Sequence, residues 1–105
     1  MTDTVFDDLS NVIKTRRAAA SDESYVASLF EKGLDTILKK VGEETTELVI
    51  AGKAGDKEAV IHEAADLWFH SLILLEYWNI EPNLILKELK RRQGQSGLAE
   101  KASRA

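Results

Sequence analysis

The sequence predicts an all-α protein, and three observations support this prediction. Apolar residues recur every three or four positions through most of the chain, which is the spacing of helices that bury one face. No segment alternates apolar and polar residues as a half-buried β-strand would. The single proline, Pro82, stands at a position that suits the first turn of a last helix. We therefore expect five helices built around one helical hairpin.

Two short helices precede the hairpin. We expect the first over Val5–Arg17 with Thr4 as its N-cap, because a threonine hydroxyl can accept a hydrogen bond from a free N–H of the first turn. A short polar linker should follow it. The second helix should span Tyr25–Lys32, with Ser24 as its N-cap and Gly33 at its end.

Two longer helices follow and form the hairpin. The first is expected over Leu34–Ala51 and the second over Lys57–Asn79, with a turn at 52–56 between them. Helices joined by so short a turn run antiparallel and lie side by side. On the first helix, an apolar stripe with a period of about 3.6 residues should face the core. The stripe consists of Leu34, Ile37, Leu38, Val41, Thr45 and Leu48.

Gly42 lies inside this first hairpin helix, where a glycine costs about 1 kcal/mol relative to alanine. Two explanations of this glycine remain open. Either it marks a tolerated kink or a close contact between helices, or it leaves room for a ligand near the backbone.

The second hairpin helix is apolar almost all round in its middle part, residues 67–75. A helix without a polar face is buried on every side, and one chain of 105 residues can hardly enclose it alone. We therefore expect a homodimer, in which the hairpin and its copy form a core of the four-helix-bundle type. The polar exceptions fall near one line of the helix: Glu63, Asp66, His70 and Tyr77.

The remaining part of the chain completes a single domain, which we expect to comprise residues 1–105. The last helix should span Pro82–Gln93, because Pro82 suits a first turn and apolar residues follow it at helical spacing. A polar tail at 94–105 ends the chain. We expect a ligand or a partner to be needed to order that tail.

Composition and charge exclude several classes of function. The formal net charge is −4, so non-specific binding to nucleic acid is not expected. The longest apolar run is too short and too polar to span a membrane. The N-terminal segment lacks the basic start and apolar core of a signal peptide. The chain has no cysteine, which fits a protein of the reducing cytoplasm.

Five carboxylates gather on the two hairpin helices: Glu43, Glu44, Glu47, Glu63 and Asp66. Both sets lie about ten residues from the turn, so they sit at nearly the same height in the hairpin. Acids three or four positions apart share one face of a helix. Glu44 with Glu47, and Glu63 with Asp66, can therefore each hold part of one ion. Such a cluster needs a counter-charge, and the oxygen ligands favour Mg²⁺, or Mn²⁺ in its place.

This pattern has a functional and a plain explanation. A metal ion held there would polarise a phosphoryl oxygen and activate a water molecule, and Glu43 could take up the water proton or a further ion. The plain explanation is a solvated, charged helix surface, which glutamates form in most helices. Glu63 and Asp66 argue against it, because they lead directly into the apolar helix and buried acids need compensation.

Four further side chains need an explanation, and three of them have two. Lys40 either pairs with Glu44 one turn on or reaches a substrate phosphate. Arg91 either contacts phosphate or only favours the C-terminal end of its helix. We expect His70 to be a core histidine bonded to a nearby acid or carbonyl rather than a metal ligand. His62 should be a surface or interface residue.

Several stretches of the chain resemble a known family, the phosphoribosyl-ATP pyrophosphatases of histidine biosynthesis. They belong to the superfamily of all-α nucleoside-triphosphate pyrophosphohydrolases, which includes MazG-like proteins. The resemblance extends over nearly the whole chain, and the stretches that carry it are Ser24–Phe30, Gly33–Leu34, Lys39–Glu44, His62–Leu67 and Ser96–Arg104.

The resemblance implies hydrolysis of 1-(5-phosphoribosyl)-ATP to 1-(5-phosphoribosyl)-AMP and pyrophosphate, with cleavage between the α and β phosphates. It also implies that Mg²⁺ is bound by four acids, and that Glu43 assists a second ion or the water. The four acids are Glu44, Glu47, Glu63 and Asp66. Two alternatives stand beside this one. The chain could remove non-standard or deoxynucleoside triphosphates, or it could be a helical dimerisation module without enzyme activity.

Overall fold

The computed structural model describes residues 4–94 together with Gly97, Lys101 and Arg104. Its five helices confirm the all-α prediction, and the described residues include no strand. None of the helices in these ranges combines the length and apolar character that crossing a bilayer requires. The helices are α1 (Val5–Arg17), α2 (Tyr25–Lys32), α3 (Leu34–Ala54), α4 (Lys57–Tyr77) and α5 (Pro82–Arg92).

The ends of the first two helices follow from their capping residues. The Ser24 side chain accepts a hydrogen bond from the backbone N–H of Ala27, and Gly33 ends α2 with a φ of 100°, as predicted. Thr4 stands at the N-cap of α1 but makes no capping bond. Its hydroxyl donates instead to the Asp8 carboxylate at 3.0 Å, because that charged acceptor lies one turn away.

The hairpin turn is tighter than predicted. Helix α3 continues three residues beyond Ala51, to Ala54, and is capped by Gly55, which has the left-handed φ of 77° that glycine adopts without steric cost. Asp56 then caps α4 by accepting a hydrogen bond from the N–H of Ala59. Gly55 and Asp56 alone reverse the chain direction, so residues 52–54 of the expected turn are helical. Helix α4 ends two residues earlier than expected, at Tyr77. Most of the predicted tail lies outside the described residues.

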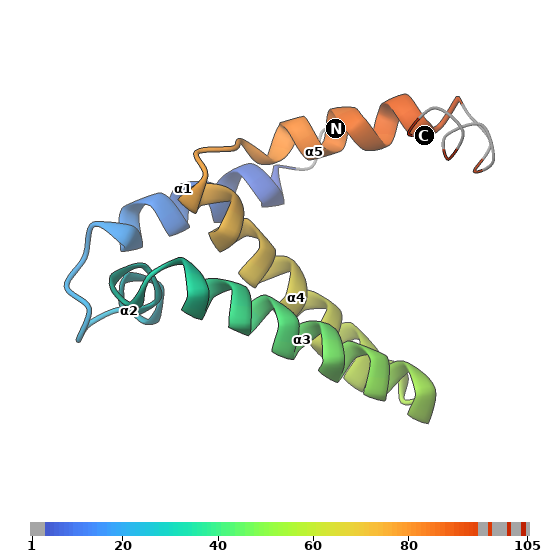
Figure 1. Cartoon of the computed structure of the whole chain (residues 1–105), viewed down its shortest axis with the longest axis horizontal. Coiled ribbons are helices and arrows are strands. Elements are labelled where there is room, and N and C mark those ends of the chain that lie inside the picture. Colours follow the sequence, from blue (N-terminus) through green and yellow to red (C-terminus); the bar gives the residue numbers. More distant parts are fainter. Residues whose placement is uncertain (1–3, 95–96, 98–100, 102–103, 105) are drawn as a thin grey trace.

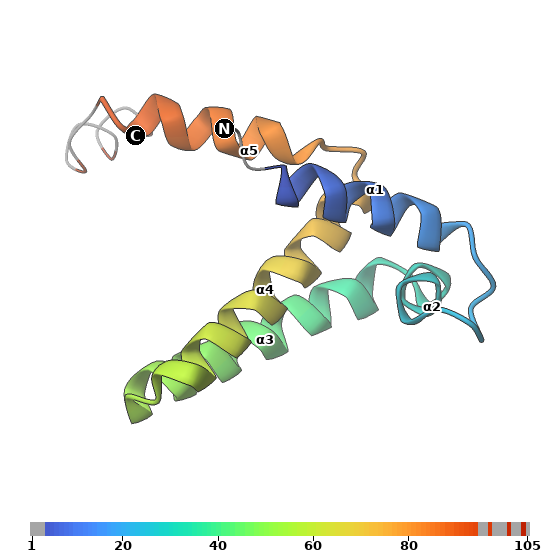
Figure 2. The same ribbon diagram turned by 180° about the vertical axis from the view of Figure 1, so that it is seen from behind.

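The α3–α4 hairpin projects from the rest of the molecule as a long arm (Figure 1). Helix α2 packs near the start of α3, and α1 lies beside α2, α4 and α5 at the same end of the arm, away from its tip (Figure 2). The buried core lies where α1, α2, α3 and α4 meet. It consists of Ile13, Val26, Leu29, Ile37, Leu72 and Ile73.

The buried face of α3 differs from the predicted apolar stripe. Three residues spaced seven apart are buried in one line: Ile37, Glu44 and Ala51. Leu38, which belongs to the predicted stripe, is 45% exposed, and Thr45 is exposed as well. The polar line of α4 explains the shift. Glu63 of that line has a carboxylate oxygen within 4.8 Å of those of Glu44 and Glu47, and Glu44 is the acid of α3 that is buried there.

Much apolar surface remains outside the core. Trp68 is 58% exposed, and several residues of α5 are about half exposed: Leu84, Ile85, Leu86 and Leu89. The radius of gyration is 15.9 Å, whereas a compact domain of this length has about 13 Å. A groove of about 460 Å³ runs between α1, α4 and α5 and is lined almost entirely by apolar side chains, Trp68 and Ile85 among them. One copy of the chain therefore does not enclose its own apolar residues.

The Gly42→Ala variant is expected to be more stable than the parent chain by about 1 kcal/mol. Gly42 lies in an uninterrupted helix, and a Cβ built there meets no atom within 4 Å, so no close helix contact explains the glycine. Thermal unfolding followed by circular dichroism measures the gain. If the glycine leaves room for a ligand, the same variant will raise the KM for substrate; an unchanged KM and a lower melting temperature would contradict both expectations.

Candidate active site

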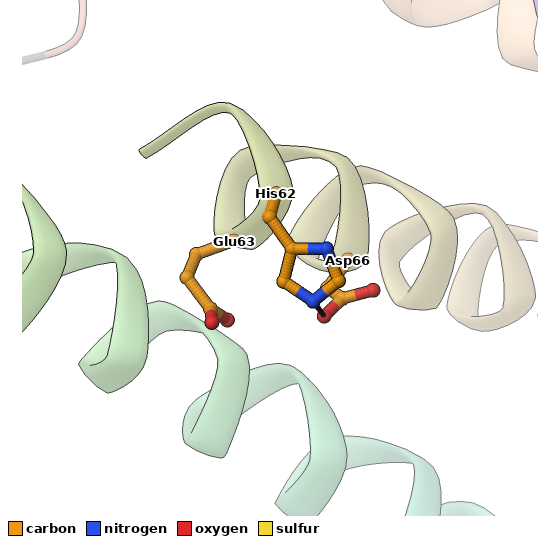
Figure 3. A group of neighbouring side chains, drawn as sticks. All are labelled: His62, Glu63 and Asp66. Atoms are coloured by element: carbon orange, nitrogen blue, oxygen red, sulfur yellow. Dashed lines mark ion pairs between the residues drawn. The ribbon is translucent and has the colours of Figure 1, made fainter. Parts of the chain in front are cut away.

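The acids of the hairpin converge on one position between α3 and α4. Carboxylate oxygens of Glu44 and Glu47 on α3 and of Glu63 on α4 all lie within 4.8 Å of one another. Figure 3 shows the Glu63 side chain pointing from α4 toward α3. The matched heights expected from the hairpin therefore bring together three of the four acids that the sequence assigns to a metal.

Two oxygens of this group are buried without a hydrogen-bond partner. They are Oε2 of Glu44 and Oε2 of Glu63, and Glu44 as a whole is only 6% exposed. A buried, unpaired carboxylate oxygen is costly, since it loses its water and gains nothing in return. A divalent cation with oxygen preference would satisfy both atoms, so the residues present fit the metal that the sequence implies.

The same crowding shifts the acidities of the group. Burial raises the pKa of Glu44, and the carboxylates of Glu47 and Asp66 raise it further, while His70 lowers it. Burial also raises the pKa of Glu63, and contact with Glu47 acts in the same direction. Like charges held this close oppose each other's ionisation, so without a cation the cluster retains protons at higher pH than isolated glutamates do.

Asp66 lies at the edge of the group and pairs with a histidine. Its carboxylate is 3.3 Å from Nε2 of His62, one turn earlier on α4, as Figure 3 shows. His62, Glu63 and Asp66 have ligand atoms within 4.8 Å of one another, so Glu63 belongs to both sets. His62 is exposed, as predicted. Its contact with Asp66 was not foreseen, although the spacing of four residues is the signal that would have found it.

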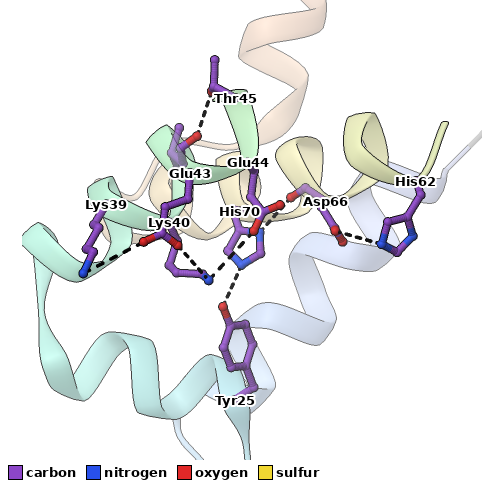
Figure 4. A network of polar contacts seen from close by, with 10 residues as sticks. Tyr25, Lys39, Lys40, Glu43, Glu44, Thr45, His62, Asp66 and His70 are labelled. Atoms are coloured by element: carbon purple, nitrogen blue, oxygen red, sulfur yellow. Dashed lines mark hydrogen bonds and ion pairs between the residues drawn. The ribbon is translucent and has the colours of Figure 1, made fainter. Parts of the chain in front are cut away.

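Glu43 lies outside the buried group. Its carboxylate is 3.2 Å from the Lys40 ammonium and 4.0 Å from that of Lys39. Lys40 also lies 3.9 Å from Glu44, which confirms the expected pairing one turn on. Figure 4 shows Lys40 between the two glutamates, on the side of the cluster that faces α2. The Lys40 ammonium therefore lies between the exposed carboxylate of Glu43 and the buried carboxylate of Glu44.

Tyr25 and His70 connect the start of α2 to the cluster (Figure 4). Nδ1 of His70 lies 2.8 Å from the main-chain oxygen of Asp66, and Nε2 lies 2.8 Å from the Tyr25 hydroxyl. A carbonyl oxygen can only accept, so Nδ1–H is the donor and, in the neutral ring, Nε2 accepts from the tyrosine. His70 is buried, and the bond to a carbonyl confirms the prediction of a core histidine.

Arg91 lies apart from the acids within this chain. It stands on α5, where its guanidinium forms two hydrogen bonds to Glu88, of 2.7 and 3.0 Å. Those bonds and a further one from Arg92 lower the pKa of Glu88 to about 2. Helix α5 packs beside α1 rather than on the hairpin. These bonds to Glu88 hold the Arg91 guanidinium on α5, and its role as a phosphate contact stays a prediction.

Lowering the pH from 8 to 5 is expected to raise the melting temperature of the metal-free protein. The pKa values of Glu44 and Glu63 are raised above the ordinary 4.5, so the folded state binds more protons than the unfolded state in this window. Stability therefore increases as pH falls through the raised pKa values. Glu88, whose pKa is lowered to about 2, opposes this only below about pH 4.5.

The Glu44→Gln variant is the control for this pH dependence. It removes one of the two acids, so its melting temperature should vary less between pH 8 and 5 and should exceed that of the parent at pH 8. Scanning calorimetry at four pH values measures both effects. A parent protein that loses stability steadily on acidification through this range would show that the acids are not crowded as described.

Comparisons with known proteins identify the family of this chain. A family model described as phosphoribosyl-ATP pyrophosphohydrolase matches residues 6–93. The phosphoribosyl-ATP pyrophosphatase of Geobacter metallireducens is 56% identical over 97% of this chain and 94% of its own length. The enzyme of that name from Geotalea daltonii is 55% identical over 99% of this chain and 98% of its own length. The one from Methylococcus capsulatus is 54% identical over 91% of each chain. This chain therefore belongs to the phosphoribosyl-ATP pyrophosphohydrolase family.

Proposed function

We propose that this protein hydrolyses 1-(5-phosphoribosyl)-ATP to 1-(5-phosphoribosyl)-AMP and pyrophosphate in histidine biosynthesis, with Mg²⁺ as the cofactor. Water supplies the new oxygen, the anhydride bond between the α and β phosphates breaks, and a proton is released. The observation that carries this proposal is the pair of buried, unpartnered oxygens on Glu44 and Glu63, in a chain that belongs to this enzyme family.

Glu44, Glu47 and Glu63 are the proposed metal ligands, of which Glu44 is buried, Glu63 is half-buried and Glu47 is exposed, and Asp66 completes the set from its edge. Mg²⁺, or Mn²⁺ in its place, would supply Lewis-acid polarisation of a phosphoryl oxygen and would activate a water molecule. The carboxylates that would hold the ion come from two helices, so their relative positions are fixed by helix packing rather than by a flexible loop. Burial excludes bulk water from one side of the group.

Glu43 and Lys40 have supporting roles in this proposal. Glu43 is exposed and paired with Lys39 and Lys40, so it is placed to accept a proton or to assist a second ion rather than to hold the first. Lys40 would contact a substrate phosphate from the open side of the cluster. Arg91 is retained as a phosphate contact only for a site to which α5 of a second copy contributes.

We also propose that the protein is a homodimer, because one copy leaves its apolar α4 and α5 residues uncovered. The groove between α1, α4 and α5 has an apolar lining and a volume of about 460 Å³, and a second copy offers the same exposed apolar helices to fill it. Symmetric self-association of one such surface produces a two-fold dimer. This arrangement would create the four-helix-bundle type of core that the sequence suggests.

Release of pyrophosphate from phosphoribosyl-ATP, with and without Mg²⁺, tests the proposed reaction. A panel of nucleoside and deoxynucleoside triphosphates in the same assay tests the main alternative, since a preference for any of them would favour a housecleaning enzyme. Calorimetric titration with Mg²⁺ tests the non-enzymatic alternative. A chain that neither binds the ion nor gains thermal stability from it would overturn the proposed metal site.

A further inference from the structure

One exposed aromatic ring lies beside the acidic cluster. Three aromatic side chains of the described residues are more than half exposed, namely Tyr25 at 51%, Trp68 at 58% and Trp78 at 59%. Trp68 lines the apolar groove, and Trp78 follows the C-terminal end of α4. Tyr25 begins α2, and Figure 4 shows its side chain pointing from that helix toward Glu44 and His70. The exposed ring of Tyr25 therefore lies at the edge of the proposed site.

Both ends of the Tyr25 side chain are anchored. Its backbone lies in the first turn of α2, which Ser24 caps, and its carbonyl oxygen accepts a hydrogen bond of 2.6 Å from the Ser28 hydroxyl. Its own hydroxyl lies 2.8 Å from Nε2 of His70, a side chain that is only 6% exposed. A tyrosine has only two side-chain torsion angles, so these anchors fix the orientation of the ring before a ligand binds.

The contact with His70 leaves the faces of the tyrosine ring available. The two ring planes are nearly perpendicular, at 83°, with centroids 5.8 Å apart, and the hydrogen bond joins them through the hydroxyl at the rim of the tyrosine ring. Within the described part of the chain, no second aromatic ring contacts Tyr25. A tyrosine that served only as core filling would bury its ring, which is the large apolar part of the side chain. Here the rim is held and the ring stays exposed.

Hydrogen bonds also connect this ring to the proposed metal ligands. Nδ1 of His70 lies 2.8 Å from the main-chain oxygen of Asp66. A nucleotide whose phosphates lie at the acids carries its base only one ribose away, so the Tyr25 ring is within reach of that base. Every base has a π face, and bases stack on aromatic side chains of this kind.

We propose that the exposed ring of Tyr25 is the stacking surface for the purine base of the substrate, and that the bond to His70 holds the ring in position. This inference rests on the proposed function. It assigns base binding to α2, whereas α3 and α4 supply the acids. Stacking does not read the hydrogen-bonding edge of a base, so this contact should favour a nucleotide over inorganic polyphosphate without distinguishing adenine from guanine.

Two ligands that differ only by the nucleoside test this role. α,β-Methylene-ATP carries three phosphates and the base and resists cleavage between its α and β phosphates, whereas inorganic triphosphate carries the phosphates alone. Calorimetry in the presence of Mg²⁺ measures the affinity for each. Tyr25→Leu should weaken binding of methylene-ATP about tenfold and change that of triphosphate less than about twofold. Tyr25→Phe keeps the ring and loses only its anchor, so it should lose less affinity for methylene-ATP than Tyr25→Leu.

Proton NMR of the bound nucleotide reports the stacking directly. The H2 and H8 signals of the adenine should shift upfield when methylene-ATP binds the parent protein, because the ring current of Tyr25 shields protons above its face. The shift should disappear in Tyr25→Leu and persist in Tyr25→Phe. Trp78→Leu is the matched control, since it removes a similarly exposed ring from the far end of α4, and it should leave the shift and both affinities unchanged.

Equal losses of affinity for methylene-ATP and triphosphate in Tyr25→Leu would mean that Tyr25 only supports the fold, and would overturn the inference. Unshifted base protons in the parent would overturn it as well, and this measurement stands even where Tyr25→Leu does not fold. A parent that shows the Tyr25-dependent shifts but releases no pyrophosphate from phosphoribosyl-ATP would disprove the proposed function and support the stacking role. Hydrolysis of phosphoribosyl-ATP with an unchanged KM in Tyr25→Leu would overturn the inference alone.

Discussion

Hydrolysis of phosphoribosyl-ATP is expected to fall about a hundredfold or more in the Glu44→Gln variant. Glu44 is the most buried of the five acids, and its Oε2 has no partner within the described structure. Loss of groups that only orient a metal ligand already costs about 10- to 100-fold, so loss of a ligand itself should cost at least as much. The measurement is kcat for pyrophosphate release at saturating Mg²⁺, with Mg²⁺ affinity from calorimetry.

Two matched variants make this result specific. Glu43→Gln removes the neighbouring exposed carboxylate and should leave Mg²⁺ affinity unchanged while it slows the reaction less than Glu44→Gln does, because Glu43 lies outside the group of ligand atoms. Glu31→Gln removes an exposed acid of α2 and should leave the rate unchanged. If Glu43→Gln proved the more damaging substitution, the first ion would have to be assigned to Glu43 instead of Glu44.

The second large effect is expected at Trp68. If the exposed apolar surface of α4 and α5 is covered by a second copy, Trp68→Asp places a charge in a buried interface. The variant should sediment as a monomer and lose about 3 kcal/mol or more of stability. In a protein that works as a monomer, a residue 58% exposed would instead tolerate the change within about 0.5 kcal/mol.

Trp78→Asp provides the comparison for this prediction. Trp78 is 59% exposed and directly follows α4, the helix that carries Trp68, but it does not line the groove. It should remain dimeric in sedimentation equilibrium at concentrations that dissociate Trp68→Asp. Equal behaviour of the two variants would mean that the groove is not the centre of the interface.

The hairpin and its acids could be predicted because they depend on local rules. Residue spacing fixes which acids share a face, and the short turn fixes the height at which the two faces meet. The capping residues follow the same local rules. The side chains of Ser24 and Asp56 accept the capping hydrogen bonds of α2 and α4, and the left-handed backbone of Gly55 ends α3. The capping bond predicted for Thr4 does not form, because the Thr4 hydroxyl donates to the nearby carboxylate of Asp8 instead.

The rest depended on which face of each helix meets its neighbour. From the apolar periodicity, Leu38 and Thr45 were predicted to face the core. The structure buries Glu44 instead, because Glu63 on the facing helix α4 is also polar. Hydrophobic patterning does not predict that an acid is buried against other acids, because such burial is unfavourable unless a counter-ion compensates the charges. The Tyr25–His70 bond joins residues 45 apart in sequence, and no local rule relates them.

The tight cap at Gly55–Asp56 also shows where this fold can change its length. Every residue from 52 to 58 is exposed, and the carboxylate ligands lie about 10 Å or more along the arms from the tip. Extra residues at the tip would leave both arms in register. One extra residue inside an arm would instead rotate everything beyond it by about 100° and turn the ligands of that helix away from the other. The tip is therefore the place to graft a tag or a reporter, whereas the arms do not tolerate insertion.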